Sequence, residues 1–331
     1  MDVHALGWIA LAAIILTMIT IDVVGHVRTP HEPSMREAAA WSAAYIAMAC
    51  AFGAVVWAVW GGRYGQEYFA GYITEKALSI DNLFVFVIML AAFRVPRAYQ
   101  QEVLLAGIVI ALALRLVFIL AGAALVERFG AVFYVFGALL IGTAVRQVVD
   151  ARRPDGPDDG AEYADNAVTR LVRRVLPTTD GFVGNRLIHR HAGRTMITPM
   201  LIAVVALGSA DLMFAVDSIP AIFGLTSEPF LVFSATAFSL LGLRQLYFLI
   251  DGLLERLVYL PYGLAVILGF IGLKLIDHAL RVNSLPLING GRPVELVPEP
   301  STAVSLLVIV VTLVVVAVAS LLRTRRRGGR R

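Results

Sequence analysis

The sequence EKALSIDNLFVF, residues 75–86, places four polar or charged side chains in a segment that is otherwise apolar enough to cross a lipid bilayer. These side chains are Glu75, Lys76, Asp81 and Asn82. Burying a carboxylate at membrane depth costs several kcal/mol, so an acid at that depth indicates a functional site rather than a neutral substitution. This segment is therefore the first candidate for the site of the protein's activity.

A second stretch, DLMFAVDSIP at residues 211–220, repeats the pattern. It carries Asp211, Asp217 and Ser218 among apolar residues, and its two acids are six residues apart, as Glu75 and Asp81 are. The equal spacing in two distant segments predicts that both contribute to one site.

The composition indicates a membrane protein. Of the 331 residues, 59% are hydrophobic and 16% are charged, and the mean hydropathy is +0.79. These values lie outside the range of soluble globular proteins and predict a chain that crosses the membrane several times. A single cysteine, Cys50, excludes an intramolecular disulfide and a cysteine-based metal site. No nucleic-acid-binding motif and no catalytic motif is present, so we expect neither a nucleic-acid partner nor an enzyme.

Apolar runs of about 20 residues predict an all-α fold with about nine transmembrane helices. The runs are residues 6–24, 38–60, 68–93, 103–126, 131–149, 197–224, 230–250, 258–276 and 303–322. Pro220 interrupts the sixth run and makes its second half the least certain. The positive-inside rule then gives the orientation. With the N-terminus outside and the C-terminus in the cytoplasm, the inner loops and tail hold 20 of the 28 Lys and Arg residues and the outer loops hold four.

The connection between the fifth and sixth runs, residues 150–194, is the one long segment outside the predicted membrane. Its mixed charges, prolines and glycines favour a solvated linker with a short amphipathic helix. A regulatory or metal-sensing role for His189 and His191 is the alternative, but two histidines are a weak signal for a metal site.

The two acidic stretches belong to a longer internal repeat. Glu75 and Asp81 pair with Asp211 and Asp217 at a shift of 136 residues, and Arg115 pairs with Arg244 at a shift of 129. Each copy spans three helices, so the copies enter the membrane from opposite sides, as in transporters with an inverted-topology repeat.

The predicted divisions follow this repeat. They are two N-terminal helices (1–67), the first three-helix repeat (68–150), a cytoplasmic connection (151–195), the second three-helix repeat (196–278), and an outer loop, last helix and basic cytoplasmic tail (279–331).

The candidate ligands are all hard oxygen donors: Glu75, Asp81, Asn82, Asp211, Asp217 and Ser218. This set suits Mg²⁺, Ca²⁺ or Mn²⁺ rather than Zn²⁺ or Cu⁺. Because the carboxylates would repel one another unless cations or protons bind, the same set also suits proton coupling. Acids six residues apart lie about 9 Å apart along a regular helix and do not share a face. We therefore expect one or both helices to open at the site so that up to four carboxylates converge.

Four cationic residues within the spans have a supporting role: Lys76, Arg115, Arg244 and Lys274. One alternative is that they pair with the acids in buried salt bridges that serve packing alone. Arg115 and Arg244, which have no acid at a fixed offset, fit bracing of the helices better than contact with a substrate.

Four motifs together resemble the TerC/Alx family of bacterial membrane proteins. They are EKALSIDNLFVF (75–86), DLMFAVDSIPAIFG (211–224), GLRQLYF (242–248) and YGLAVILGFIGLK (262–274), and the likeness runs from about Trp41 to the tail. The resemblance implies a nine-helix protein of the bacterial inner membrane. It also implies a role in manganese homeostasis, chiefly efflux of Mn²⁺, with the intramembrane acids as the metal pathway. The family name comes from tellurium resistance, and some members are described as redox modulators.

The leading hypothesis is a secondary transporter that exports Mn²⁺ or a similar hard divalent cation, with no prosthetic group. Asp81 and Asp217 are the predicted primary ligands, and Glu75 and Asp211 complete the site or carry protons. The alternatives are a non-transporting scaffold or stress-response protein, linked to tellurium resistance or redox balance, and an exporter of an organic cation or amino acid.

Overall fold

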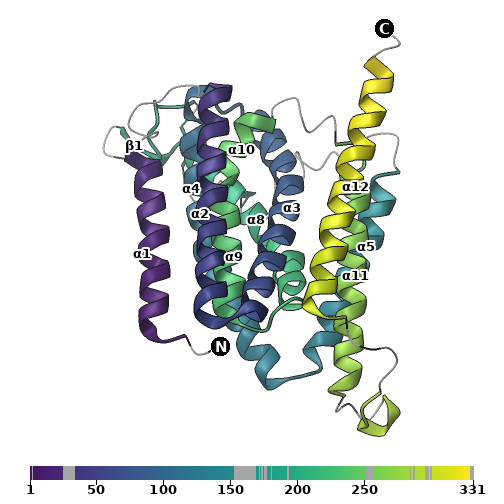
Figure 1. Cartoon of the computed structure of the whole chain (residues 1–331). Coiled ribbons are helices and arrows are strands. Elements are labelled where there is room, and N and C mark those ends of the chain that lie inside the picture. The colour runs from purple at the N-terminus through teal and green to yellow at the C-terminus, as the bar shows by residue number, and fades with distance from the viewer. Residues whose placement is uncertain are drawn as a thin grey trace.

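The structure is a computed structural model, and it forms a bundle of long helices that run side by side (Figure 1). It describes residues 1, 3–24, 34–152, 169–170, 172, 174, 177–179, 181–191, 194–250, 257–283, 285, 288–294, 298 and 300–328. The N-terminus lies at the lower end of the bundle in Figure 1 and the C-terminus at the upper end. We call these the lower end and the upper end of the bundle.

The first three helices are α1 (Ala5–Asp22), α2 (Met35–Trp60) and α3 (Gly62–Ala92). The Ser34 hydroxyl caps α2 because it accepts a hydrogen bond of 3.2 Å from the Glu37 amide. A single residue, Gly61, separates α2 from α3, and its φ of 98° is one that glycine adopts without strain. The chain therefore reverses at the lower end with almost no loop.

The next helices are α4 (Arg97–Arg128), α5 (Val132–Asp150) and α8 (Pro199–Phe223). They are followed by α9 (Pro229–Leu241), α10 (Leu243–Ile250), α11 (Leu260–Arg281), the 3₁₀ turn η3 (Asn289–Gly291) and α12 (Thr302–Gly328). The predicted span over 230–250 corresponds to one candidate span, Pro229–Leu249, in which a turn at Gly242 separates α9 from α10 while the φ of −82° and ψ of −2° of Gly242 stay in the right-handed helical region.

The connection between α5 and α8 contains an antiparallel hairpin of β1 (Ile188–His191) and β2 (Arg194–Ile197). The sequence did not predict this hairpin, which places His189 and His191 on one strand. The short amphipathic helix expected in this connection falls largely on residues outside the described ranges.

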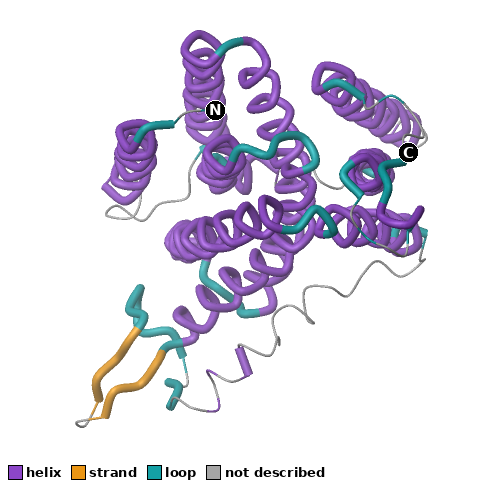
Figure 2. The backbone as a smooth tube through the Cα atoms, turned by 90° about the horizontal axis from the view of Figure 1, so that it is seen from below, coloured by secondary structure: helices purple, strands orange, loops and turns teal. Residues whose placement is uncertain are grey.

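The contacts between helices fall into two groups, and Figure 2 shows the bundle along its axis with the β1–β2 hairpin projecting from one side. In one group α3 packs against α9, and α4 packs against α8. In the other, α5 packs along most of its length against α11, and α12 lies against α11 and α3. These are the pairs that two inverted copies, α3–α5 and α8–α11, would form, although the repeat itself stays a prediction.

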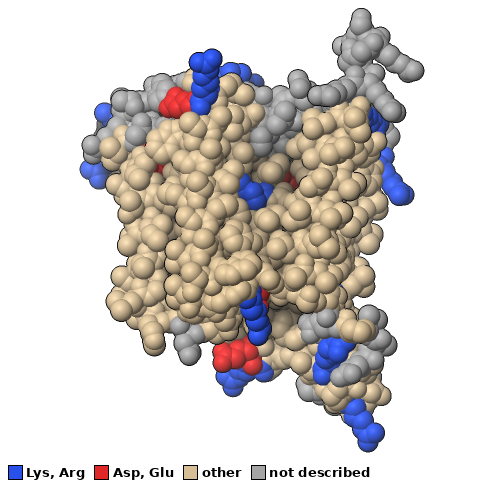
Figure 3. All heavy atoms as spheres, in the orientation of Figure 1, with Lys and Arg blue, Asp and Glu red and all other residues tan. Residues whose placement is uncertain are grey.

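Eight described helices are long and apolar enough to cross a membrane: α1, α2, α4, α5, α8, the α9–α10 pair, α11 and α12. α3, of 31 residues, lies among them but is not one of the eight. It contacts α2, α8, α9 and α12 and carries the first acidic stretch. The face shown in Figure 3 agrees with this view, since most of its charged side chains gather at the upper and lower ends, with a broad band of other residues between them. The chain is therefore an all-α polytopic membrane protein.

Candidate functional site

Arg115 is the centre of a buried cluster that joins three helices. From α4, its Nε donates to Oδ2 of Asp211 at 2.7 Å and its Nη2 donates to Oδ1 of the same residue at 3.1 Å. A planar guanidinium fits a carboxylate in this two-pronged way, which gives both strength and a fixed geometry. The first residue of the second acidic stretch is thereby tied to α4.

The remaining nitrogen of Arg115 faces the first acidic stretch. Its Nη1 donates to Oε1 of Glu75 on α3 and to the Ser218 hydroxyl on α8, the latter at 3.1 Å. The Ser79 hydroxyl, one turn along α3, lies 3.5 Å from the same Glu75 oxygen. Four of the residues predicted from the two stretches and the supporting set therefore meet: Glu75, Arg115, Asp211 and Ser218.

The cluster lies deep inside the bundle. Glu75 and Arg115 have 0% of their surface exposed, and Asp211 and Ser218 have 1%. Glu75 is thirteen residues from the lower start of α3 and Asp211 twelve residues from the upper start of α8. At 1.5 Å per residue these positions are each about 20 Å from an end of the bundle, which is mid-depth in a bilayer.

Asp81 and Asp217 lie on opposite sides of this cluster. α3 runs upward and α8 runs downward, so six further residues carry Asp81 about 9 Å toward the upper end and Asp217 about 9 Å toward the lower end. Asp81 accepts a 3.0 Å hydrogen bond from Gln147 of α5. Asp217 is half-buried and within electrostatic reach of Glu75 and Arg115. Asn82, also half-buried, follows Asp81 on α3.

The expected opening of the helices at the acids is wrong. Both α3 and α8 are continuous through the two stretches, and Pro220 is accommodated three residues before the end of α8. Unbroken helices hold acids six residues apart on different faces, so the four carboxylates do not converge. In the part of the chain that the structure describes, no three His, Cys, Asp or Glu side chains are grouped to hold a metal ion.

Lys76 faces the turn at Gly242 that separates α9 from α10. Lys76 Nζ donates at 3.2 Å to the carbonyl of Ser239, one of the carbonyls released at the end of α9. A Cβ added at Gly242 would stand 2.9 Å from this ammonium group, so the glycine provides the space that Lys76 occupies. Lys76 thus supports the α9–α10 junction rather than pairing with an acid of its own stretch.

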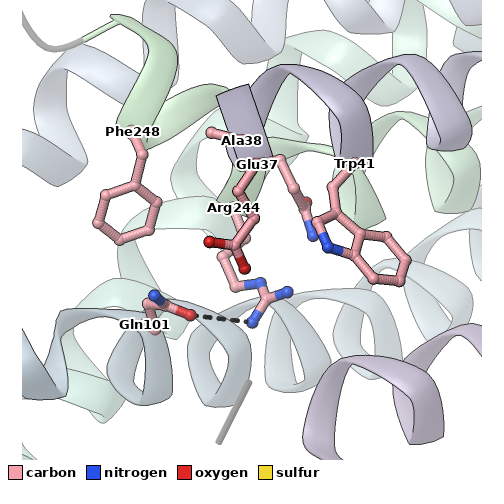
Figure 4. Close-up of a pocket in the computed structure, with 7 residues that line it drawn as sticks. Glu37, Ala38, Trp41, Gln101, Arg244 and Phe248 are labelled. Atoms are coloured by element: carbon pink, nitrogen blue, oxygen red, sulfur yellow. Dashed lines mark hydrogen bonds between the residues drawn. The ribbon is translucent and has the colours of Figure 1, made fainter. Parts of the chain in front are cut away.

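Arg244 lies in a second buried group near the upper end. Its Nη2 donates to Oδ1 of Asp22 on α1 at 2.6 Å, and its Nη1 donates to Gln101 of α4 at 3.4 Å (Figure 4). Gln245 donates to the same Asp22 oxygen at 3.3 Å. A small pocket lies beside Arg244 and is lined also by Glu37, Ala38, Trp41, Gln101, Gln245 and Phe248. The expectation that Arg244 braces helices fits these contacts.

A larger cavity, of about 820 Å³, opens at the lower end. It is lined by the lower ends of α3, α5, α8, α11 and α12, with Arg63, Glu67, Lys274 and His278 among its polar side chains. Lys274 lies 3.4 Å from the Ser305 hydroxyl of α12. Phe223, in the wall of the cavity, is five residues from Ser218 on α8. The central cluster is therefore about 8 Å along that helix from the cavity.

A match to a protein-family model covers most of the helices described above. The model of the integral membrane protein TerC family matches residues 60–328, which include both acidic stretches and every residue of the central cluster. The chain belongs to the TerC family. Its Arg115-centred cluster is thus made by helices that all lie within the family region.

Several TerC-family relatives are similar over long stretches. An uncharacterized membrane protein of Mycobacterium tuberculosis is 48% identical over 310 residues, which is 93% of this chain and 77% of the relative. The thylakoid membrane protein TERC of Arabidopsis thaliana is 40% identical over 231 residues, 70% of this chain and 59% of the relative. The "Putative membrane-bound redox modulator Alx" of Escherichia coli is 32% identical over 278 residues, 81% and 85% of the two chains. No solved structure matches this chain.

Sequence reasoning missed two partners of the predicted residues. Asp22 is fully buried against Arg244, and Gln147 binds Asp81. Asp22 could have been identified from the sequence as a candidate buried acid, because it lies in the last turn of an apolar first helix. No sequence pattern could have identified Gln147, since a glutamine near the end of a helix is common on surfaces facing water.

Proposed function

We propose that this TerC-family protein is a secondary transporter that exports Mn²⁺, or a similar hard divalent cation, through the central cluster. The observation that carries the proposal is the pair of fully buried carboxylates, Glu75 and Asp211, placed at mid-depth on helices from the two halves of the chain. Buried acids at this depth are costly, and in transporters they mark the substrate pathway. Their oxygen atoms are the ligand type that Mn²⁺ and Mg²⁺ prefer.

The order of the acids supports a path along the bundle axis. Asp81, then the Glu75–Asp211 pair, then Asp217 follow one another from the upper to the lower end. With the lower end outside, as the Lys and Arg distribution predicts for a bacterial inner-membrane protein, the path leads from the cytoplasm toward the 820 Å³ cavity. A cation would pass along hard oxygen ligands, with protons as candidate counter-ions, and one helix group would rock against the other.

Arg115 lies between the central carboxylates and pairs with both. The same ion pairs are also what a non-transporting protein would use for packing alone, with Asp211 and Glu75 neutralised by Arg115. The two readings differ in one measurable property, the flux of Mn²⁺ through purified protein.

The test is reconstitution of the protein in liposomes with a Mn²⁺-sensitive dye inside. Wild-type protein should move Mn²⁺ down its gradient, while Glu75→Gln and Asp211→Asn should lower the rate by about a hundredfold, because each removes a charged ligand. Asp277→Asn is the matched control, since this acid pairs with Arg281 on α11, outside the central cluster, at 2.9 Å. Absence of Mn²⁺ flux through folded wild-type protein, or full flux through both site variants, would contradict the proposal.

A further inference from the structure

Arg115 holds the oxygen atoms that a divalent cation needs. Its contacts include both oxygens of Asp211, Oε1 of Glu75 and the Ser218 hydroxyl. A hard divalent cation is held by six or more oxygen ligands, and carboxylate oxygens supply most of its charge balance. The guanidinium and a bound cation would therefore compete for one set of ligands.

The charge balance also indicates that Arg115 and a divalent cation do not bind the two carboxylates at the same time. Glu75 and Asp211 carry two negative charges, and Arg115 carries one positive charge that a protein does not remove by deprotonation. A divalent cation between the two carboxylates balances them alone. Among the three charged groups in direct contact, Glu75, Asp211 and Arg115, a divalent cation added with Arg115 still in place would leave an excess positive charge, which is unfavourable at 0% exposure.

The empty site needs Arg115 for the opposite reason. Without a cation, two buried carboxylates would repel each other and face an apolar surrounding, which a protein tolerates only when they are paired. The second Glu75 oxygen, Oε2, is buried and has no hydrogen-bond partner in the described structure. Arg115 therefore satisfies the central carboxylates only in part, which leaves an acceptor available for a bound cation.

We infer that Arg115 is a tethered substitute for the transported cation. It neutralises Glu75 and Asp211 while the site is empty and is displaced from them when a divalent cation binds. This inference rests on the proposed transport function and adds to it the means by which the unloaded protein reorients. Each transport cycle then alternates between a site filled by the cation and a site filled by the guanidinium.

The test separates net efflux from exchange in liposomes. Net efflux of Mn²⁺ into Mn²⁺-free buffer requires the empty protein to return, whereas exchange of radioactive Mn²⁺ for unlabelled Mn²⁺ requires only the loaded protein to cross. Arg115→Gln should retain exchange and lower the ratio of net efflux to exchange by about tenfold or more, because the bare carboxylates resist burial. A role in structure alone would lower both fluxes equally.

Arg244→Gln is the control, because Arg244 is the other buried arginine of the repeat and pairs with Asp22 outside the central cluster. It should leave the flux ratio at the wild-type value, whatever its effect on stability. Arg115→Lys keeps the positive charge but not the guanidinium fork, so it should keep the ratio within about threefold of wild type. If Arg115→Gln does not fold, the flux ratio of Arg115→Lys still tests the inference.

Two results would overturn the inference: an unchanged ratio of net efflux to exchange in folded Arg115→Gln, with or without an equal loss of both fluxes, or a ratio in Arg115→Lys as low as expected for Arg115→Gln. Wild-type protein that performs neither efflux nor exchange would instead contradict the proposed function, so the two failures are distinguishable.

Discussion

Asp81 and Asp217 stand about 9 Å to either side of the central carboxylates, and their surroundings differ. Asp81 is bonded to Gln147 on the upper side, whereas Asp217 is near the lower cavity and within electrostatic reach of Glu75 and Arg115. Antiparallel helices produce this arrangement from two stretches with the same spacing. In a cation path, each acid would therefore serve the side of the membrane that it faces.

This placement predicts an asymmetric effect of two equivalent substitutions. Asp81→Asn should raise the Mn²⁺ concentration for half-maximal efflux on the upper side by about tenfold, which corresponds to losing about 1.4 kcal/mol of binding. Asp217→Asn should leave that concentration near the wild-type value and weaken binding from the lower side instead.

The measurement is Mn²⁺ flux in liposomes of defined protein orientation, with the concentration varied on one side at a time. The same concentration shift on both sides for each variant would show that the two acids belong to one central site.

At the scale of the helices, α5 and α11 pack against each other more extensively than any other pair of described helices. A Cβ added at Gly137 would stand 2.8 Å from the Gly272 carbonyl, and one at Gly272 would stand 3.0 Å from the Gly137 carbonyl. Small residues at such crossings let two backbones approach, and dispersion forces then hold helices together in a lipid environment. The glycines of the YGLAVILGFIGLK motif therefore determine how tightly α11 fits.

Gly272→Ala should destabilise the protein by about 1–3 kcal/mol, because the new methyl group meets backbone atoms that cannot move without separating the helices. Gly142→Ala on α5 is the matched control, since nothing lies within 4 Å of a Cβ built there. That substitution should be neutral or stabilising by about 0.5–1 kcal/mol, as expected for glycine in an open helix position.

Thermal unfolding of the two purified variants in detergent compares them directly. Equal stability of Gly272→Ala and Gly142→Ala would mean that the α5–α11 contact is looser than the structure describes.

At the scale of the whole molecule, function depends on which end of the bundle faces the cytoplasm. The upper end carries the β1–β2 hairpin and the end of α12, and the lower end carries the N-terminus and the 820 Å³ cavity (Figure 1). The Met1 amine pairs with Glu228 at 2.7 Å, and this contact raises the pKa of the amine to about 10. The N-terminus is thus fixed at the lower end by a charged contact.

The predicted orientation is tested by cysteine labelling in intact cells. With Cys50 replaced by alanine, Ser301→Cys at the lower end should react with a membrane-impermeant maleimide, and Arg190→Cys on β1 should react only after the membrane is opened. Both side chains are exposed in the structure, so access is decided by the membrane. Labelling of Arg190→Cys but not Ser301→Cys in intact cells would invert the direction of transport proposed above.

The sequence by itself determined the class of fold and the chemistry of the site. Long apolar runs have no soluble alternative, and carboxylates within them stand out because their burial is costly, so the all-α membrane fold and the two acidic stretches could be found from periodicity and composition. The family was also recognisable from its motifs. The expectation of open helices at the acids was wrong, because a proline near a helix end is tolerated without breaking the helix.

Only the tertiary structure decided which residues meet. Arg115 lies 40 residues from Glu75 and 96 from Asp211, and no local pattern gives the partner of a buried guanidinium. The same holds for Arg244 and Asp22, which are 222 residues apart. Local spacing fixes depth and helical face, whereas long-range packing fixes which faces touch. That difference turned four candidate acids into a central pair with a shared arginine and one acid on each side.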